Sequence, residues 1–324
     1  MKIPAEAFPE NKKRIPALSG IFYDLHFLPF PISYIWKINC SKPVAFNKTT
    51  AKLKWFIRRH PLIYFMRYLL LSENHKGNPE DDTGCFNDTN NISEVPDIFF
   101  KVNNEIVFPD GDEFSKALTI ARFLRDRVPV GPSASLSSAK TLEQMLYGKG
   151  GVCNDFSQVF NIFCLINNIR VKEWNCVDRL YKTRYGHTFN EIFVPQLNYW
   201  VAIDIHKGIY FNDTEGNPLS ATALFQNLRN SKKVNFIYYS DYRPAKPERL
   251  QFVYSGNTIP FIISNYNNKL VDEYLDKYRN MPPFVAGLMM VMAGKNYHFT
   301  FVLDNYKEKM FPFLFRNHNR QKET

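Results

Sequence analysis

The strongest constraint on the fold is a change of sequence period near the middle of the chain. After Cys153, apolar side chains recur every three or four positions, as on one face of a helix: Phe156, Val159, Phe160, Phe163 and Cys164. The pattern then changes to three strand-like segments, 170–177, 186–194 and 199–205. Because the connections between these segments are short, we expect antiparallel pairing. The sequence therefore predicts an α+β fold in which a helix packs on an antiparallel sheet.

Two further helices are predicted before Cys153. Residues 114–128 have helical spacing, with Asp112 placed as the N-cap and Pro129 as the stop. Residues 141–144 form a capping-box pattern that predicts a short helix ending at Gly148.

The flanks of this core carry weaker signals. Residues 1–45 contain six prolines among many aromatic residues, which favours an extended segment over a folded surface. A helix is predicted over 50–72 and a loop over 72–96. In the tail we expect helices at 221–228 and 269–280, and strands at 234–240, 250–255 and 297–303. The domain hypothesis is an N-terminal extension over 1–100, a core over 101–215 and a C-terminal α/β extension over 216–324.

The charge of the chain favours acidic partners. Its 41 Lys and Arg residues outnumber 31 Asp and Glu, which gives a formal net charge of +10. Nucleic acid, an anionic glycan or an anionic membrane surface would suit such a charge. The basic residues are nevertheless spread along the chain, and no motif marks any of these partners. The oligomeric state is not indicated.

The cysteines and the N-terminus predict a cytoplasmic protein with reduced thiols. Five widely spaced cysteines are an odd number and do not resemble a disulfide framework. Prolines and charges occupy the N-terminal positions where a signal peptide needs an apolar core. There is also no apolar run of about 18 residues that would span a membrane.

Cys153 stands where a thiol is easily activated. It begins the predicted helix, and the free N–H groups of a helix N-terminus lower the pKa of a thiol. Gly150 and Gly151 precede it closely and allow a sharp turn and a close approach to a substrate carbonyl. The N–H of Cys153 is then a candidate donor to an oxyanion.

His187 and Asp204 complete a nucleophilic constellation. His187 opens the second predicted strand, and we expect its ring to point at the packed helix and accept the thiol proton. Asp204 ends the next strand of the same hairpin, where same-face side chains approach to about 5 Å. A carboxylate there would orient the imidazole, as the aspartate does in a Ser-His-Asp triad.

Three sequence blocks around these residues resemble the transglutaminase-like superfamily: GGVCNDFSQVFNIFCLINNIRVKEW, GHTFNEIFV and YWVAIDIHKG. That family has a Gly-x-Cys helix start, a His closely followed by a strand glutamate, and a Trp a few residues before an Asp. The resemblance covers about residues 112–212. It implies a papain-like α+β core with Cys153 as nucleophile, His187 as base and Asp204 as orienting carboxylate. Thr188, Phe189 and Asn190 depart from the family pattern, which bears on substrate choice more than on chemistry.

The resemblance implies a cysteine-dependent enzyme that transfers an acyl group or hydrolyses an amide through a thioester. Its substrate would be an unknown protein, peptide or glycoconjugate with an amide or ester bond, and no cofactor is expected. The alternative is an inactive transglutaminase-like scaffold or binding protein. The intact Cys-His-Asp set favours the enzyme.

Other polar residues near the three blocks have simpler interpretations. Cys164 and Cys176 are expected to be buried core thiols. His206, two residues after Asp204, is the alternative imidazole, but no close ligand pair of the zinc type supports a metal site. Glu191 is expected either to hydrogen-bond beside the site or to lie as a charge on its rim.

Overall fold

The computed structural model describes residues 67–78, 81–132, 134, 136–180, 185–242, 244–278 and 297–312. All of these belong to one compact unit, Phe46–Thr324, which is distinct from a second unit, Met1–Ala45. The predictions for 1–45 and for most of the helix at 50–72 lie outside the described residues. The described end of that helix, 67–71, is helical.

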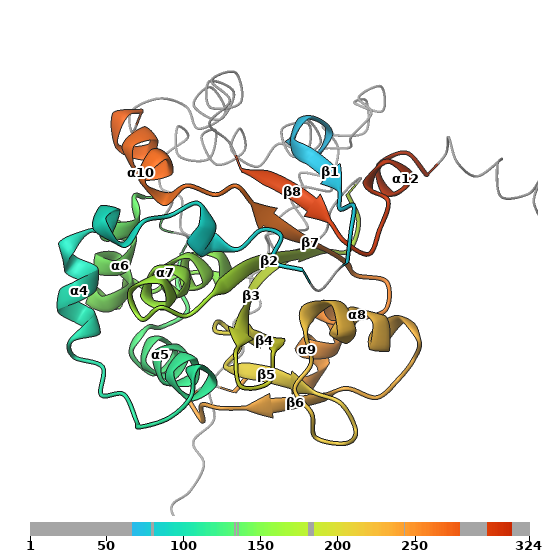
Figure 1. Ribbon diagram of the computed structural model, residues 1–324, viewed down its shortest axis with the longest axis horizontal. Helices are drawn as coiled ribbons and strands as arrows, with labels where there is room; N and C mark the ends of the chain where they lie inside the picture. The colour runs from blue at the N-terminus through green and yellow to red at the C-terminus, as the bar shows by residue number, and fades with distance from the viewer. Residues whose placement is uncertain are drawn as a thin grey trace, which may run out of the picture. The chain divides into compact units, whose positions relative to one another are not determined.

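A single sheet organises the described residues (Figure 1). Its eight strands are β1 (Ser72–Asn74), β2 (Val171–Val177), β3 (Gly186–Val194), β4 (Tyr199–Asp204), β5 (Ile209–Asn212), β6 (Asn235–Tyr238), β7 (Ile259–Ser264) and β8 (His298–Phe301). They follow the order β1-β8-β7-β2-β3-β4-β5-β6. β1 pairs with β8 in parallel, and the neighbouring pairs β7–β2, β2–β3 and β3–β4 are antiparallel. The predicted antiparallel strands are thus confirmed as β2, β3 and β4.

Helices cover both faces of this sheet (Figure 1). One side carries α4 (Asp97–Asn103), α5 (Glu113–Arg127), α6 (Ser138–Gln144) and α7 (Cys153–Ile166). The other side carries α8 (Ala221–Arg229) and α9 (Pro247–Val253). The remaining described α-helices are α10 (Asn268–Lys277) and α12 (Tyr306–Met310). The α+β fold predicted from the sequence is therefore confirmed, and the sheet extends beyond 101–215 in both directions.

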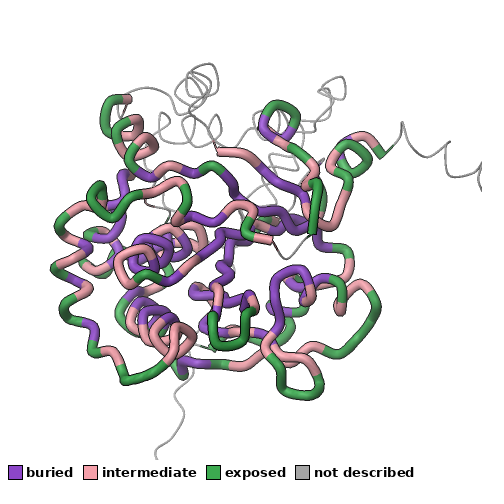
Figure 2. Tube along the Cα trace, viewed as in Figure 1, coloured by how far each residue is buried: buried purple, intermediate pink, exposed green. Residues whose placement is uncertain are grey.

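Two apolar cores hold these layers together. In the first, Phe156, Phe160 and Phe163 of α7 are fully buried against β2, β3 and β4. Burying one such side chain stabilises the fold by roughly 1.5–3 kcal/mol. In the second, Phe189 of β3 packs with Phe225 of α8. Figure 2 shows α7 and the central strands as the most deeply buried part of the chain.

Two local predictions were wrong. Residues 250–255 are not a strand, because Pro247 at the first turn and Glu248 behind it begin the helix α9. The short helix before Cys153 is not capped at Thr141. It begins at Ser138 after the N-cap position Ser137, and Thr141 is buried within it. A further π-helical turn, Met145–Lys149, then connects α6 to the glycines.

Candidate active site

Cys153 is the first residue of α7, as predicted. Val152 before it has extended backbone, and the carboxylate of Asp155 accepts hydrogen bonds from the N–H of Val152 at 3.0 Å and of Ala134 at 3.1 Å. Asp155 therefore ties the helix start to the preceding loop in addition to complementing the helix dipole. Cys153 itself is half-buried and stands at the positive end of α7.

The glycines before Cys153 are required by a close approach of two backbone segments. Gly151 forms a parallel bridge with Val130. Gly150 has a φ of 72°, and a Cβ added there would lie 2.2 Å from the carbonyl oxygen of Pro129. Only a residue without a side chain fits this position. The packing of these segments therefore determines where α7 begins.

Replacing Gly150 by Ala should destabilise the fold and slow the reaction of Cys153 with iodoacetamide. The backbone conformation of Gly150 (φ 72°, ψ −171°) alone costs a residue with a side chain about 1–3 kcal/mol, and the clash with the backbone of Pro129 adds to it. Gly148→Ala is a matched control, because Gly148 has a φ of 83° but open space around its Cβ position. Thermal melts and alkylation rates would test this. Equal effects of the two substitutions would show that the backbone contact is unimportant.

His187 joins Cys153 to Asp204. Its Nε2 lies 2.7 Å from Oδ2 of Asp204, and both side chains are buried. The His187 ring is also close enough to Cys153 for its charge to lower the pKa of the thiol. Since Nε2 is engaged with Asp204, Nδ1 is the nitrogen available to the thiol. The structure thus brings the three predicted residues into one line of contacts.

Besides His187, three other groups hold Asp204 in place. Its Oδ2 also accepts a hydrogen bond from the hydroxyl of Tyr254 at 2.8 Å, and its Oδ1 accepts one from the N–H of Lys207 at 2.9 Å. The hydroxyl of Tyr239 donates to its backbone carbonyl at 3.2 Å. Tyr254 follows α9, from a region predicted as strand, so no sequence signal linked it to Asp204. These bonds fix the carboxylate that orients His187.

The electrostatics of the three residues favour a thiolate and an imidazolium. Burial alone would raise the pKa of Cys153, but the charge and hydrogen bond of His187 and the N–H of Thr188 outweigh it and lower this pKa. Burial would lower the pKa of His187, yet the charges of Asp204 and Cys153 raise it to about 9. Burial opposes ionisation of Asp204, and His187 reverses this and lowers its pKa to about 2. Each group therefore stabilises the charge of its neighbour.

The prediction that α7 packs on the face of β3 shared by His187 was wrong. His187 shares its strand face with Phe189 and Glu191, and that face packs on α8 and α9 instead of α7. Helix α7 covers the opposite face, where Asn190 bonds to it. The ring of His187, at the start of β3, still contacts Cys153, because both residues lie at the ends of their elements.

The remaining polar residues take structural positions. Cys164 and Cys176 are buried, as predicted, and burial raises their pKa well above the usual value. Glu191 is a buried hydrogen-bonding group and no rim charge: its carboxylate accepts from Trp174 Nε1 at 2.8 Å and from the N–H of Ala221 at 2.7 Å.

His206 lies beside the His187 ring but is uncharged at neutral pH. Its ring centroid is 5.8 Å from that of His187 and 5.5 Å from that of Phe156. Burial and the positive charges of Lys207 and His187 lower its pKa to about 3. Within the described ranges, no three His, Cys, Asp or Glu side chains are placed to hold a metal ion.

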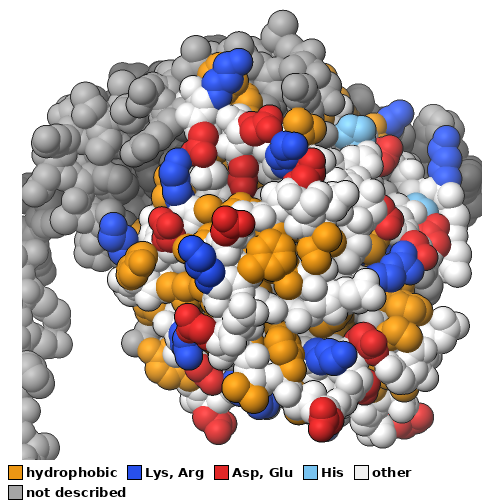
Figure 3. Space-filling view, turned by 60° about the vertical axis from the view of Figure 1, so that its left-hand side comes forward, with side chains coloured by type: hydrophobic (Ala, Val, Ile, Leu, Met, Phe, Trp, Pro, Cys, Tyr) orange, Lys and Arg blue, Asp and Glu red, His pale blue; other side chains and the backbone are white. Residues whose placement is uncertain are grey.

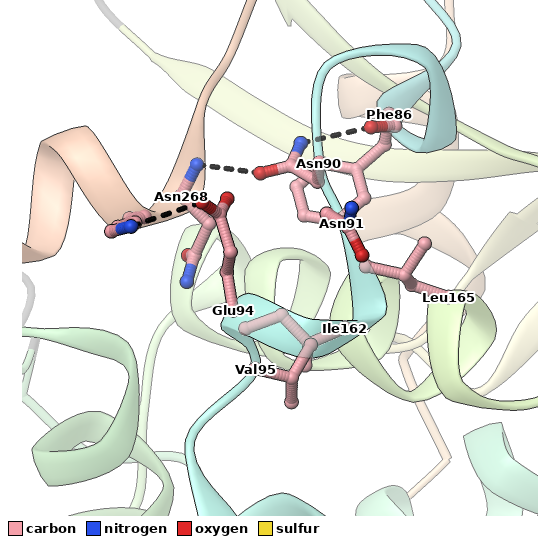
Figure 4. A pocket seen from close by; sticks show the side chains of 9 residues that line it. Phe86, Asn90, Asn91, Glu94, Val95, Ile162, Leu165 and Asn268 are labelled. Carbon is pink, nitrogen blue, oxygen red and sulfur yellow. Dashed lines mark hydrogen bonds and ion pairs between the residues drawn. The ribbon is translucent and has the colours of Figure 1, made fainter.

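A small pocket elsewhere in the molecule is unrelated to this site. It is lined by Asn90, Asn91 and Glu94, by Ile162 and Leu165 at the far end of α7, and by Asn268 (Figure 4). Its polar groups already bond to one another or to backbone: Asn90 accepts from the N–H of Asn268, for example.

Comparison with known proteins finds one similar family for part of the chain. A family model described as the transglutaminase-like superfamily matches residues 101–205, a segment that contains Cys153, His187 and Asp204. No curated protein matches the chain. Among solved structures, a chain from Cytophaga hutchinsonii that is provisionally described as a cysteine protease matches with 18% identity and a TM-score of 0.28. That match covers 34% of this chain and only 37% of the other.

Proposed function

We propose that this chain, which has a transglutaminase-like core over residues 101–205, is a cysteine-dependent acyltransferase or amide hydrolase. The observation that carries the proposal is the contact of one buried imidazole with both Cys153 and Asp204. A thiol at a helix N-terminus with an oriented imidazole is the arrangement that nucleophilic acyl transfer needs.

The first half-reaction forms a thioester. The Cys153 thiolate attacks the carbonyl carbon of an amide or ester, and the negative charge moves to the carbonyl oxygen. The N–H of Cys153 at the start of α7 is the candidate donor to that oxygen. His187, held by Asp204, then gives its proton to the leaving amine or alcohol as the carbon–heteroatom bond breaks. The acyl group remains on the sulfur of Cys153.

The second half-reaction releases the acyl group. His187, now neutral, accepts a proton from an amine or from water while that acceptor attacks the thioester carbon. The carbon–sulfur bond breaks and Cys153 leaves as thiolate beside the imidazolium. An amine acceptor gives transamidation, and water gives hydrolysis or deamidation. The three residues serve all of these outcomes, so the acceptor is decided by the surrounding cleft.

The proposed substrate bears an amide or ester, and the net charge of +10 favours an acidic one. On the face seen in Figure 3, Lys and Arg are interspersed with Asp and Glu, so this face offers no continuous basic field to nucleic acid or membrane. Across the described helices, none is long and apolar enough to cross a membrane. The four described cysteines are free, which suits the reduced cytoplasmic setting proposed for the enzyme.

An activated ester provides the direct test. We expect 4-nitrophenyl acetate to release a burst of about one nitrophenolate per chain and to leave one acetyl group on Cys153, detected by peptide mass spectrometry. Cys153→Ala should abolish both signals. Adding hydroxylamine or an alkylamine then distinguishes transfer from hydrolysis by the product formed. A chain with intact fold that shows no burst, or acetylates other residues equally, would instead be a scaffold.

A further inference from the structure

A line of polar side chains crosses the otherwise apolar interface between α7 and the sheet. The hydroxyl of Ser157 donates to Oδ1 of Asn190 at 2.6 Å. Nδ2 of Asn190 donates to Oδ1 of Asn161 at 2.7 Å, and Nδ2 of Asn161 donates to Oε2 of Glu173 at 3.0 Å. All four side chains are buried, with at most 4% exposure. They form one connected chain from the helix to β3 and β2.

Burying these four polar side chains costs desolvation free energy, so we expect them to specify a structural feature. The surrounding positions are apolar, including Phe160 on α7 and Ile192 on β3. Apolar residues there would bury without the desolvation cost of amides and a carboxyl group. A fully connected buried network, by contrast, accepts only one placement of the helix on the sheet. Its members therefore determine register more than they add stability.

The two elements joined by the chain are those that carry the nucleophile and the base. Ser157 and Asn161 lie one and two turns after Cys153 on α7, which places them on the same side of the helix. Asn190 lies three residues after His187 on β3. Its side chain accepts a hydrogen bond from the Ser157 hydroxyl and donates one to the Ser157 backbone carbonyl. A shift of α7 along β3 would break these bonds and separate the Cys153 sulfur from the His187 ring.

We propose that the buried chain Ser157–Asn190–Asn161–Glu173 is a positioning device that holds Cys153 against His187, with Glu173 as its terminal group. This inference rests on the proposed thiol chemistry. None of the four residues is assigned to touch the reacting atoms, and they act through α7 and β3.

The surroundings of Glu173 explain why its carboxyl group keeps a proton. Asn161 faces it from α7, Asn190 pairs opposite it on β3, and Tyr266 approaches from the segment after β7. Its described hydrogen bond is to a neutral amide. Burial raises the pKa of Glu173 to about 8, the hydrogen bond from Asn161 lowers it, and the negative charge of Cys153 raises it further. At neutral pH no second negative charge then opposes the thiolate.

The test compares alkylation rates of Cys153 by iodoacetamide in full-length variants at pH 6.5. Ser157→Ala removes one hydrogen bond and should slow the reaction about 3- to 10-fold. Glu173→Leu should slow it about 10- to 100-fold by displacing the helix. Glu173→Gln keeps an acceptor for Asn161 and should stay within about threefold of the parent. Ser264→Ala is the matched control, since its hydroxyl is also buried and bonded at 2.7 Å, to Thr300 on β8.

The alkylation rate of Cys153 as a function of pH tests whether Glu173 is neutral. Because Glu173 is neutral in the parent, Glu173→Gln should leave unchanged the pH at which the rate falls on the acid side. If the fall in rate moves to lower pH in Glu173→Gln, the substitution has removed a negative charge that raised the pKa of Cys153. Glu173 would then be ionised in the parent, and its role as a protonated group would be overturned. Folded Ser157→Ala and Glu173→Leu variants that react like Ser264→Ala would overturn the positioning role. If Glu173→Leu does not fold, Ser157→Ala decides that point. If the catalytic proposal itself is wrong, Cys153 should react as fast in His187→Ala as in the parent, which is a different result.

Discussion

At pH 6, iodoacetamide should alkylate Cys153 at least about tenfold faster than any other cysteine of the native chain, and His187→Ala should slow that reaction about a hundredfold. An unassisted thiol with a pKa near 8.5 is only about 0.3% thiolate at this pH. The charge and hydrogen bond of His187 lower the pKa of Cys153 and keep it ionised. Quenched-flow alkylation with peptide mass spectrometry measures the rate at each cysteine.

Cysteines in the core provide an internal reference for this measurement. Cys85, Cys164 and Cys176 are buried, and burial raises the pKa of each. They should react slowly in the native chain and quickly once it is unfolded. Cys153→Ala measures any contribution from thiols elsewhere in the sequence. A slow Cys153 whose rate is the same in His187→Ala would exclude an activated thiol.

Asp204→Asn should lower kcat/KM for the activated ester about 10²- to 10⁴-fold with little change of structure. The amide is nearly the same size as the carboxylate, and its one oxygen can still accept from the N–H of Lys207, while its NH2 group takes the place of the oxygen that accepts from Tyr254 and His187. It no longer provides the negative charge that raises the pKa of His187. His187 should then be mostly neutral near pH 7, so Cys153 loses its counter-ion and the leaving group loses its proton donor. An unchanged kcat/KM would exclude the orienting role.

The same substitution should flatten the dependence of stability on pH. Asp204 has its pKa lowered from 3.8 to about 2, so its contribution is present above about pH 4 and is lost as the pH falls towards 2. His187 has its pKa raised from 6.5 to about 9, so its contribution is present below about pH 6.5 and is lost as the pH rises through 9. The pair therefore stabilises the parent most between about pH 4 and 6.5. Urea unfolding of parent and Asp204→Asn, followed from below about pH 4 through this range and up to about pH 9, measures the difference.

Local patterns predicted the parts of the site that depend on neighbours in sequence. The glycines, the helical stripe after Cys153 and the three strands were read from periods of a few residues. The structure places α7 and β2 to β4 where these patterns indicated. A hairpin also brings residues of adjacent strands together by itself, so the proximity of His187 and Asp204 followed from register. Asp112 caps α5 as predicted, by accepting from the N–H of Ser115.

Contacts between distant segments were beyond such patterns. Tyr254 reaches Asp204 from the end of α9, fifty positions away, and β7 brings the C-terminal region into the sheet beside β2. The face that α7 covers was also misjudged, because an alternating strand such as β3 is buried on both sides. The alternation of side chains along a strand assigns each residue to one of the two faces of the sheet, but it does not say which helix packs on each face.

The sequence by itself therefore determined the three candidate residues, the element on which each lies and the order of those elements. These features arise from short-range spacing, helix-start geometry and hairpin register. Only the tertiary structure decided which face α7 covers, which hydroxyls hold Asp204 and how Glu173 is joined to α7. Those contacts depend on the packing of segments far apart in the chain, where burial and hydrogen-bond satisfaction select a single arrangement.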